Sequence, residues 1–378
     1  MLLPPKICIF STTTTTRTRT IIIHTTLHGA APLLPTSIRT YMTAQSSHRF
    51  VTQEQIDQYQ RDGILLIRNA LTKDQIEAGR IAVEEAMAHP GPQAEQIGPT
   101  SSTTWTSRSD TFDGRSSSSS SNGDSSCSTC SPKPTRNIEW TMFQDQFSSQ
   151  RCPKLLQWIG QDISPTVAAL AGQLMQSSSA TFFYDHIICK RPTTSSKVNQ
   201  IPWHQDLPYW SVKGTFTSVW IPLDVMPSEA AVQWILGSHT WGIFRPQHFV
   251  DASPYDGTDD MEPMPDIDAL FTSGQVQKTT FDVGIGDVLV FDARIIHGSP
   301  GNAPATFTST TTTTTTTATE PHLHRRIALR FGGDDAVYWT YPRETAIPTS
   351  DIPHGLFHGH RLCQSPIFPI LWTASSSS

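Results

Sequence analysis

Apolar residues along the chain are grouped mostly in short runs that turn-forming residues separate. Runs of this length, bounded by Gly, Pro, Asn or Asp, are typical of strands. We expect strands at residues 64–67, 181–184, 187–190, 217–224, 231–236, 288–291 and 325–331.

Three segments carry helical signals instead. The first begins after Thr52, a residue type that caps helices, and stops at Gly63. The second follows Thr72 and ends before Pro90, and the third covers about 165–175. Because strands and helices do not alternate as in βαβ units, the pattern predicts a mainly β fold with flanking helices. An antiparallel sandwich or barrel, and in particular a jelly roll, fits it best.

Some segments are expected to lie outside the folded core. Residues 1–48 contain no Asp or Glu and combine many Thr residues with scattered Lys and Arg, as in a mitochondrial transit peptide. The alternative is an untargeted tail on a cytoplasmic protein. Ser- and Thr-rich tracts at about 91–135 and 303–320 cannot bury enough apolar surface to offset their ordering entropy, so we expect disordered insertions there. The remainder, 49–378, is predicted to be a single domain.

Composition excludes several classes of partner. The hydrophobic share of 37% is low because of the Ser and Thr tracts, and the net charge is −6 with no long basic stripe. Nucleic acid is therefore not an expected partner, and no apolar run reaches the length of a membrane span. The six cysteines are scattered, and Cys127 and Cys130 have no second pair beside them. Free thiols in a reducing compartment are the expectation.

The strongest candidate chemistry is a metal site. His204 and Asp206 are two residues apart, and alternate residues of a strand face the same way, while Gln205 would face away. Aromatic residues on both sides of the pair favour a walled cavity. His297, which follows an apolar strand far downstream, is the best third ligand. Two histidines and one carboxylate on one face of an ion form the ligand set of non-haem Fe(II) oxygenases.

Other histidines are assigned structural positions. His239 ends a predicted strand in a Gly-Ser-His turn. His186, four residues before Lys190, is expected to be a packed or solvated strand residue. The three histidines between 354 and 360 are typical of a polar surface loop, since a structural zinc site would require closed tetrahedral ligation.

In a series of motifs the chain resembles the phytanoyl-CoA dioxygenase family. The motifs are, in order, Lys190, Trp203 to Trp210, Trp220 to Asp224, Gly237-Ser238-His239, Gly286-Asp287, His297-Gly298-Ser299, Asn302, Arg325-Arg326 and Gly333-Asp334-Asp335. The resemblance covers roughly 51–90 and 136–372. It implies a double-stranded β-helix, also called a cupin-like jelly roll, and an oxygenase that depends on Fe(II) and 2-oxoglutarate.

The resemblance also implies roles for particular residues. His204, Asp206 and His297 would be the iron ligands and the catalytic centre. Contacts to 2-oxoglutarate would come from Lys190, Gln205, Trp220 and Ser299. An arginine after His297 would pair with the far carboxylate of 2-oxoglutarate. Strand parity favours Arg326 for this role. The apolar residues of 325–331 alternate along the strand and would face outward, which leaves Arg326 facing inward, and Arg325 is the second candidate.

These implications predict a dioxygenase that hydroxylates a C–H bond of a small molecule with dioxygen as co-substrate. The family name suggests an acyl-CoA or lipid-like substrate. The lack of a long Lys/Arg cluster for the coenzyme A phosphates favours a smaller molecule. Two alternatives remain open from the residues alone. One is a non-catalytic jelly-roll protein that binds metal or ligand, and the other is a cupin-type metalloenzyme that does not use 2-oxoglutarate.

Overall fold

The computed structural model of the protein describes most of the chain after residue 50. The described residues are 44–46, 50–97, 106–107, 140–192, 200–226, 231–249, 252–301, 323–349 and 352–375. All of them belong to Ser37–Ser378, one of two units into which internal contacts divide the chain. The expected tail at 1–48, apart from residues 44–46, and most of both expected insertions fall outside the described residues.

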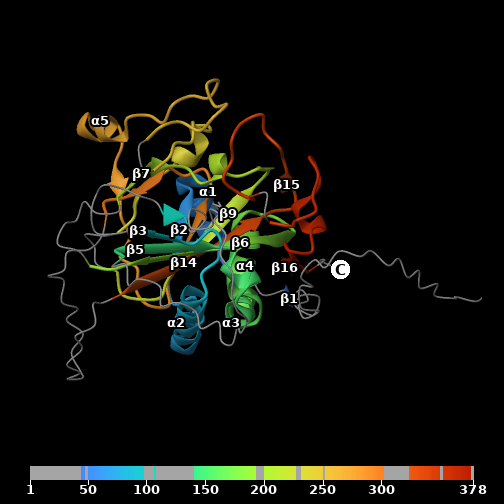
Figure 1. Ribbon diagram of the computed structural model, residues 1–378. Coiled ribbons are helices and arrows are strands. Elements are labelled where there is room, and N and C mark those ends of the chain that lie inside the picture. The colour runs from blue at the N-terminus through green and yellow to red at the C-terminus, as the bar shows by residue number, and fades with distance from the viewer. Residues whose placement is uncertain are drawn as a thin grey trace, which may run out of the picture. The chain divides into compact units, whose positions relative to one another are not determined.

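A large sheet crosses the centre of the molecule in Figure 1. Its strands run in the order β2-β12-β9-β14-β6-β5-β3-β4, with β16 pairing β6 and with β1 pairing β16. All pairs are antiparallel except β1 with β16. The bounds are β1 Ala44–Ser46, β2 Ile64–Ile67, β3 Glu95–Ile97, β4 Thr106–Ser107, β5 Met142–Gln146, β6 Ser179–Lys190, β9 Phe216–Pro222, β12 Val288–Asp292, β14 His324–Gly332 and β16 Ile370–Ala374.

A smaller sheet runs in the order β11-β10-β13-β7, with the bounds Lys278–Thr279, Gln233–Ile235, His297–Ser299 and Ile201–His204. A separate two-stranded ribbon pairs β8 Val212–Lys213 with β15 Val337–Tyr338. In Figure 1, β7 lies on the opposite side of the large sheet from α2, α3 and α4. The two sheets are antiparallel apart from the β1–β16 pair, and α2, α3 and α4 cover one side of the large sheet. This arrangement confirms the predicted mainly β architecture.

The helices follow the predicted capping signals. The hydroxyl of Thr52 or Thr72 accepts a hydrogen bond from the backbone N–H of the third helical residue, and the threonine N–H donates to the side-chain oxygen of that residue. Both α1 Gln53–Asp62 and α2 Lys73–Ala88 therefore begin with a capping box. Gly63 ends α1 with φ of 77°, a conformation that favours glycine. Farther along, α3 Pro153–Gln157 and a π-helical turn lead into α4 Ser164–Leu174, which confirms the third predicted helix. No helix of the described residues is long and apolar enough to cross a membrane.

The local structure differs from the expectations in three places. The separate strands expected at 181–184 and 187–190 are one continuous strand, β6. A short helix that the pattern did not predict, α5 Ile267–Thr272, follows Asp266, whose side chain caps it. Finally, the folded chain continues past residue 91 through β3, because β3 pairs with β5.

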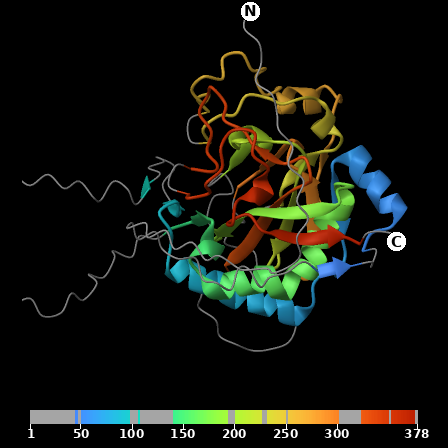
Figure 2. The same ribbon diagram turned by 90° about the vertical axis from the view of Figure 1, so that its right-hand side faces the viewer.

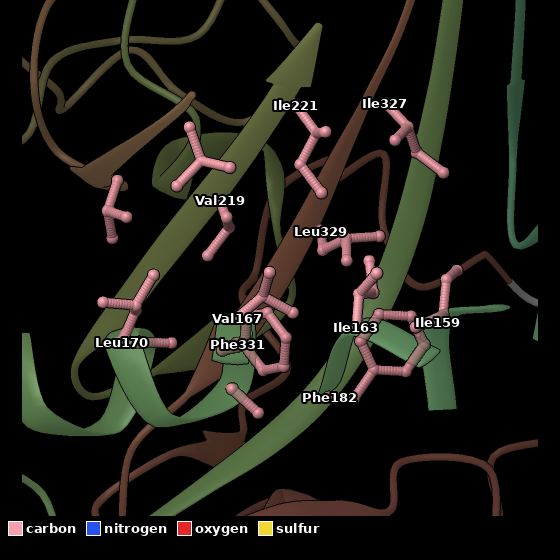
Figure 3. Close-up of a cluster of buried hydrophobic side chains, with 14 of the residues drawn as sticks. Ile159, Ile163, Val167, Leu170, Phe182, Val219, Ile221, Ile327, Leu329 and Phe331 are labelled. Carbon is pink, nitrogen blue, oxygen red and sulfur yellow. The ribbon is translucent and has the colours of Figure 1, made fainter. Parts of the chain in front are cut away.

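The two faces of the large sheet bury different kinds of residue. On one face, Val219, Leu329 and Phe331 pack against helical residues such as Val167 and Leu170 (Figure 3). Both views of the ribbon show α2 and α4 on this face (Figures 1 and 2). The alternate residues of the same strands face the other way, toward the smaller sheet. This alternation is the parity that the sequence predicted for 325–331, and it brings charged side chains to the inner face.

We expect Leu329→Ala to lower the free energy of unfolding by about 2–5 kcal/mol, because Leu329 is fully buried between the sheet and the helices. Chemical denaturation would measure the loss. Leu236→Ala is the matched control, because Leu236 is 39% exposed, and its loss should stay within about 0.5 kcal/mol. Equal losses for the two variants would contradict this packing.

Candidate metal centre and its cavity

A cavity of about 790 Å³ opens between the two sheets, within the size range of small-molecule sites. The large sheet contributes the inward residues of β6, β9 and β14, and the small sheet contributes β13 and the end of β7. The predicted ligands His204, Asp206 and His297 all line it. The three predicted ligands, although almost a hundred positions apart in the sequence, therefore line the same cavity.

Backbone pairing holds the two histidines together. His204 at the end of β7 is the register partner of His297 at the start of β13, and their ring centroids are 4.2 Å apart. Asp206 Oδ1 lies 3.8 Å from Nε2 of His204 and 3.9 Å from Nε2 of His297. Within the described part of the chain, these residues are the only group of three or more potential metal ligands, with ligand atoms within 4.8 Å of one another.

The local reason for this convergence differs from the expected one. Asp206 does not lie on a strand with His204, because β7 ends at His204. It has helical dihedral angles (φ −74°, ψ −44°) and begins a short 3₁₀ turn over Leu207–Tyr209. The turn, rather than strand alternation, brings the carboxylate back to the imidazoles.

Both imidazoles present a lone pair to the carboxylate. Nδ1 of His204 is 2.9 Å from the Pro202 carbonyl oxygen, and Nδ1 of His297 is 3.0 Å from that of Ile295. A carbonyl only accepts, so each Nδ1 carries the hydrogen and each Nε2 is free to bind a metal. Burial lowers the pKa of His204 to about 3 and also lowers the pKa of His297, so both rings are neutral. The three side chains therefore fit a divalent metal ion that prefers imidazole nitrogen and carboxylate oxygen as ligands.

Arg330, which the sequence analysis did not identify, holds the other carboxylate oxygen. Its Nη1 is 3.1 Å from Asp206 Oδ2, and both side chains are buried. Burial acts to raise the pKa of Asp206, but the positive charge of Arg330 opposes it and the pKa is lowered. The guanidinium also lies 5.8 Å from the ring centroid of Trp210 and 5.6 Å from that of Phe291. Asp206 is therefore kept ionised, with Oδ1 left for a metal.

Cationic side chains form another end of the cavity. Lys190 on β6 and Arg326 on β14 both line it and are both buried. Lys190 Nζ donates to Ser299 Oγ at 3.3 Å, which links the large sheet to the small one. Burial lowers the pKa of Arg326 to about 10, and no carboxylate of the described residues pairs with its guanidinium. Its Nη1 has no hydrogen-bond partner there, and Trp220 forms the adjoining wall. This end fits an anion such as a carboxylate.

Two predicted contacts to 2-oxoglutarate do not line the cavity. Arg325 faces the opposite side of β14, where its Nε and Nη2 donate to Asp224 at 2.8 Å and its Nη1 donates to Glu84. The Gln205 amide donates to the carbonyls of Gly242 and Arg294 and accepts from the Phe244 amide. These contacts stabilise the fold and leave both side chains outside the described cavity lining, so the role implied for Gln205 stays a prediction. Of the two adjacent arginines, Arg326 lines the cavity.

The other histidines mostly match their structural assignments. His239 is buried beside α1, where its Nε2 lies 3.1 Å from the Gln60 carbonyl oxygen. His354 packs near the Tyr338 ring rather than in a metal cluster. His186 is the exception, because it lines the cavity. Strand parity could have identified His186, because it is four residues from Lys190 and both point to the inward face of β6. The same reasoning on β14 could have identified Arg330, which is four residues from Arg326.

Comparisons with known proteins agree with this geometry. The family model described as phytanoyl-CoA dioxygenase (PhyH) matches residues 59–306. Among solved structures, the α-ketoglutarate-dependent carbocyclase SnoK from nogalamycin biosynthesis is 17% identical, with a TM-score of 0.55 over 85% of this chain and 97% of that chain. The epimerase SnoN, solved in complex with Fe3+, α-ketoglutarate and nogalamycin RO, is 15% identical, with a TM-score of 0.53 over 84% and 98%. No curated protein sequence matches the chain. The structural likeness concerns the fold, and it confirms the predicted double-stranded β-helix.

Proposed function

We propose, because the chain belongs to the phytanoyl-CoA dioxygenase family, that it hydroxylates a C–H bond of a small organic molecule. The family makes the chain an iron(II)- and 2-oxoglutarate-dependent dioxygenase. In the overall reaction, substrate, dioxygen and 2-oxoglutarate give an alcohol, succinate and carbon dioxide, and one oxygen atom of dioxygen enters each organic product. The observation that carries the proposal is the convergence of His204, Asp206 and His297 in a small-molecule cavity.

The iron would be held by Nε2 of His204, Nε2 of His297 and Oδ1 of Asp206, the three atoms that face one another. Iron held there supplies the activation of dioxygen, which no amino-acid side chain can provide. The protein fixes the tautomer of each imidazole through the Pro202 and Ile295 carbonyls. Asp206 as a carboxylate leaves no place for a halide ligand, which favours hydroxylation over halogenation.

The far carboxylate of 2-oxoglutarate would pair with Arg326. A guanidinium can bind a carboxylate with two parallel hydrogen bonds, and Arg326 has an unpartnered Nη1 inside the cavity. The Lys190–Ser299 pair supplies further donors at the same end, and Trp220 closes it. Burial, together with the neighbouring Arg326, lowers the pKa of Lys190 well below its usual range, so a bound dianion would stabilise its charged form. Little water screens the attraction between Lys190, Arg326 and the dianion.

Aromatic side chains would keep water away from the reacting centre. Trp234 stacks on the His297 ring at a centroid distance of 4.8 Å, and Phe249 lies 4.8 Å from the His204 ring. Tyr209 packs edge-on against Phe249 at 5.5 Å. These rings fix the ligand imidazoles and leave an apolar wall for the body of a substrate.

The proposal predicts that the purified protein retains ferrous iron and converts labelled 2-oxoglutarate to succinate and carbon dioxide only when a substrate is present. Substrate-stimulated succinate release, measured under air with and without added Fe(II), tests it directly. A non-catalytic binding protein would bind 2-oxoglutarate without releasing succinate for any substrate screened. A cupin-type enzyme would turn over with no dependence on 2-oxoglutarate. Failure to retain iron would overturn the proposal.

A further inference from the structure

The inner face of the large sheet carries opposite charges at its two ends. Arg326, Ile188, Gln144 and Glu95 are successive register partners on β14, β6, β5 and β3, and all four line the cavity. Adjacent strands are about 4.8 Å apart, so three steps separate Glu95 from Arg326 by about 14 Å across the sheet. The cavity therefore runs from a cationic end to a carboxylate.

The Glu95 carboxylate is held in place by a hydrogen-bonded chain. His186 Nε2 lies 3.2 Å from Gln144 Oε1, and the Gln144 amide donates to Glu95 Oε2. Burial lowers the pKa of His186 to about 3, so its ring is neutral and donates through Nε2. Because His186 occupies the Gln144 oxygen, the amide nitrogen must face Glu95. This chain orients the carboxylate without neutralising it.

Glu95 is partly buried and has no cationic partner among the described residues, and this burial raises its pKa. The cationic residues of the described cavity lining are Lys190, Arg326 and Arg330. The first two lie at the far end, and Arg330 is paired with Asp206. A partly buried carboxylate without a counter-ion would be stabilised in its charged form by a cation that arrives with a ligand.

An aromatic wall leads from the metal centre toward this carboxylate. Phe249 beside His204 contacts Tyr209, and Tyr209 lies 5.3 Å from Tyr255 in an edge-on pair. Phe249, Tyr209, Tyr255 and Glu95 all line the same cavity. Burial raises the pKa of Tyr255 to about 12, and the negative charges of Glu344 and Glu95 add to the rise. Aromatic faces beside a carboxylate are a setting that binds organic ammonium groups.

We propose that the substrate is an organic amine whose ammonium group binds between Glu95 and the wall formed by Phe249, Tyr209 and Tyr255. This inference rests on the proposed function and deepens it. The two ends of the cavity then accept the two small molecules separately, because the 2-oxoglutarate dianion is attracted to Lys190 and repelled by Glu95. A coenzyme A thioester, with its phosphates, would meet the carboxylate with no free cation in the described lining.

The test compares three probes of the same size and shape: 3-phenylpropylamine, 3-phenylpropanol and 3-phenylpropanoate, with hexanoyl-CoA as a fourth. Each is titrated into the full chain loaded with 2-oxoglutarate and Mn(II), and quenching of the cavity tryptophans reports binding. We expect the amine to bind at least about tenfold more tightly than the alcohol, because a desolvated charge pair adds to the aromatic contact. The carboxylate and the thioester should bind most weakly.

Glu95→Gln keeps the shape of the side chain and removes its charge. We expect the variant to lose the preference for amine over alcohol, a change of about tenfold or more in the ratio of the two dissociation constants. Glu54→Gln, an exposed residue in the first turn of α1, is the control and should leave the ratio unchanged. Equal affinity for the probes, no binding of any of them, or a preference that survives in Glu95→Gln overturns the inference.

Failure of the inference can be separated from failure of the proposed function. Binding of Mn(II) and of 2-oxoglutarate is measured first on the same wild-type and Glu95→Gln samples. If both bind and no amine preference follows, only the substrate class is wrong. If neither binds, the oxygenase assignment itself fails.

Discussion

Asp206→Ala will abolish metal-dependent turnover, because it removes the only carboxylate among the three convergent ligand side chains. We expect the affinity for Fe(II) to fall by more than about 100-fold, since even residues that merely support a ligand account for 10–100-fold. Retained ferrous iron after gel filtration and the rate of succinate release measure the effect. Succinate that still forms at the wild-type rate would contradict the assignment of the centre.

This variant has a second effect that needs its own control. Removing Asp206 leaves the buried Arg330 guanidinium without its counter-charge, and breaking a buried pair costs about 3–5 kcal/mol of stability. The double variant Asp206→Ala with Arg330→Met removes both charges and should recover much of that loss while binding iron no better. Chemical denaturation of the two proteins separates a missing ligand from a misfolded chain.

Arg326→Met will weaken 2-oxoglutarate binding by roughly 100-fold, because truncating one partner of a buried, hydrogen-bonded charge pair costs about 2–5 kcal/mol. The dissociation constant, measured by calorimetry with Mn(II) present, reports the change directly. The buried position of Arg326, with its Nη1 open to the cavity, is the physical reason for the large effect.

Arg325→Met is the matched control, since the neighbouring side chain has the same chemistry on the opposite face. Its contacts to Asp224 and Glu84 lie outside the cavity, so its loss should lower stability and leave the dissociation constant within about twofold. A larger effect from Arg325→Met than from Arg326→Met would reverse the assignment of the two arginines.

Much of the fold could be predicted because its signals are local. The caps at Thr52 and Thr72, the stop at Gly63 and the apolar strands depend on neighbouring residues, and each lies where the pattern indicated. The choice of Arg326 over Arg325 rested on alternation within one strand, which the β14 register maintains over that stretch. Local rules were sufficient wherever a regular strand or helix continued.

The remainder of the site depends on long-range packing that single-sequence patterns do not report. The sequence indicated a strand through Asp206, but the chain turns there, and Gln205 is used to brace that turn. Glu95 belongs to a three-residue strand that depends on its pairing with β5 and β4. Phe249 and Tyr255 reach the cavity from loops, whose course is set by tertiary contacts. Strong local signals therefore indicated the three candidate metal ligands, whereas the aromatic residues that line the cavity from loops gave no clear signal in the sequence.

The direct cross-strand pairing of His204 with His297 has a consequence for the threonine tract that follows. Residues 302–322, with their run of threonines, connect β13 to β14, and both strands are fixed by backbone pairing on either side of the connection. Both imidazoles precede residues 302–322 in the sequence, and the β7–β13 pairing fixes their spacing. Adding or removing threonines there is therefore expected to leave the distance between His204 and His297 unchanged.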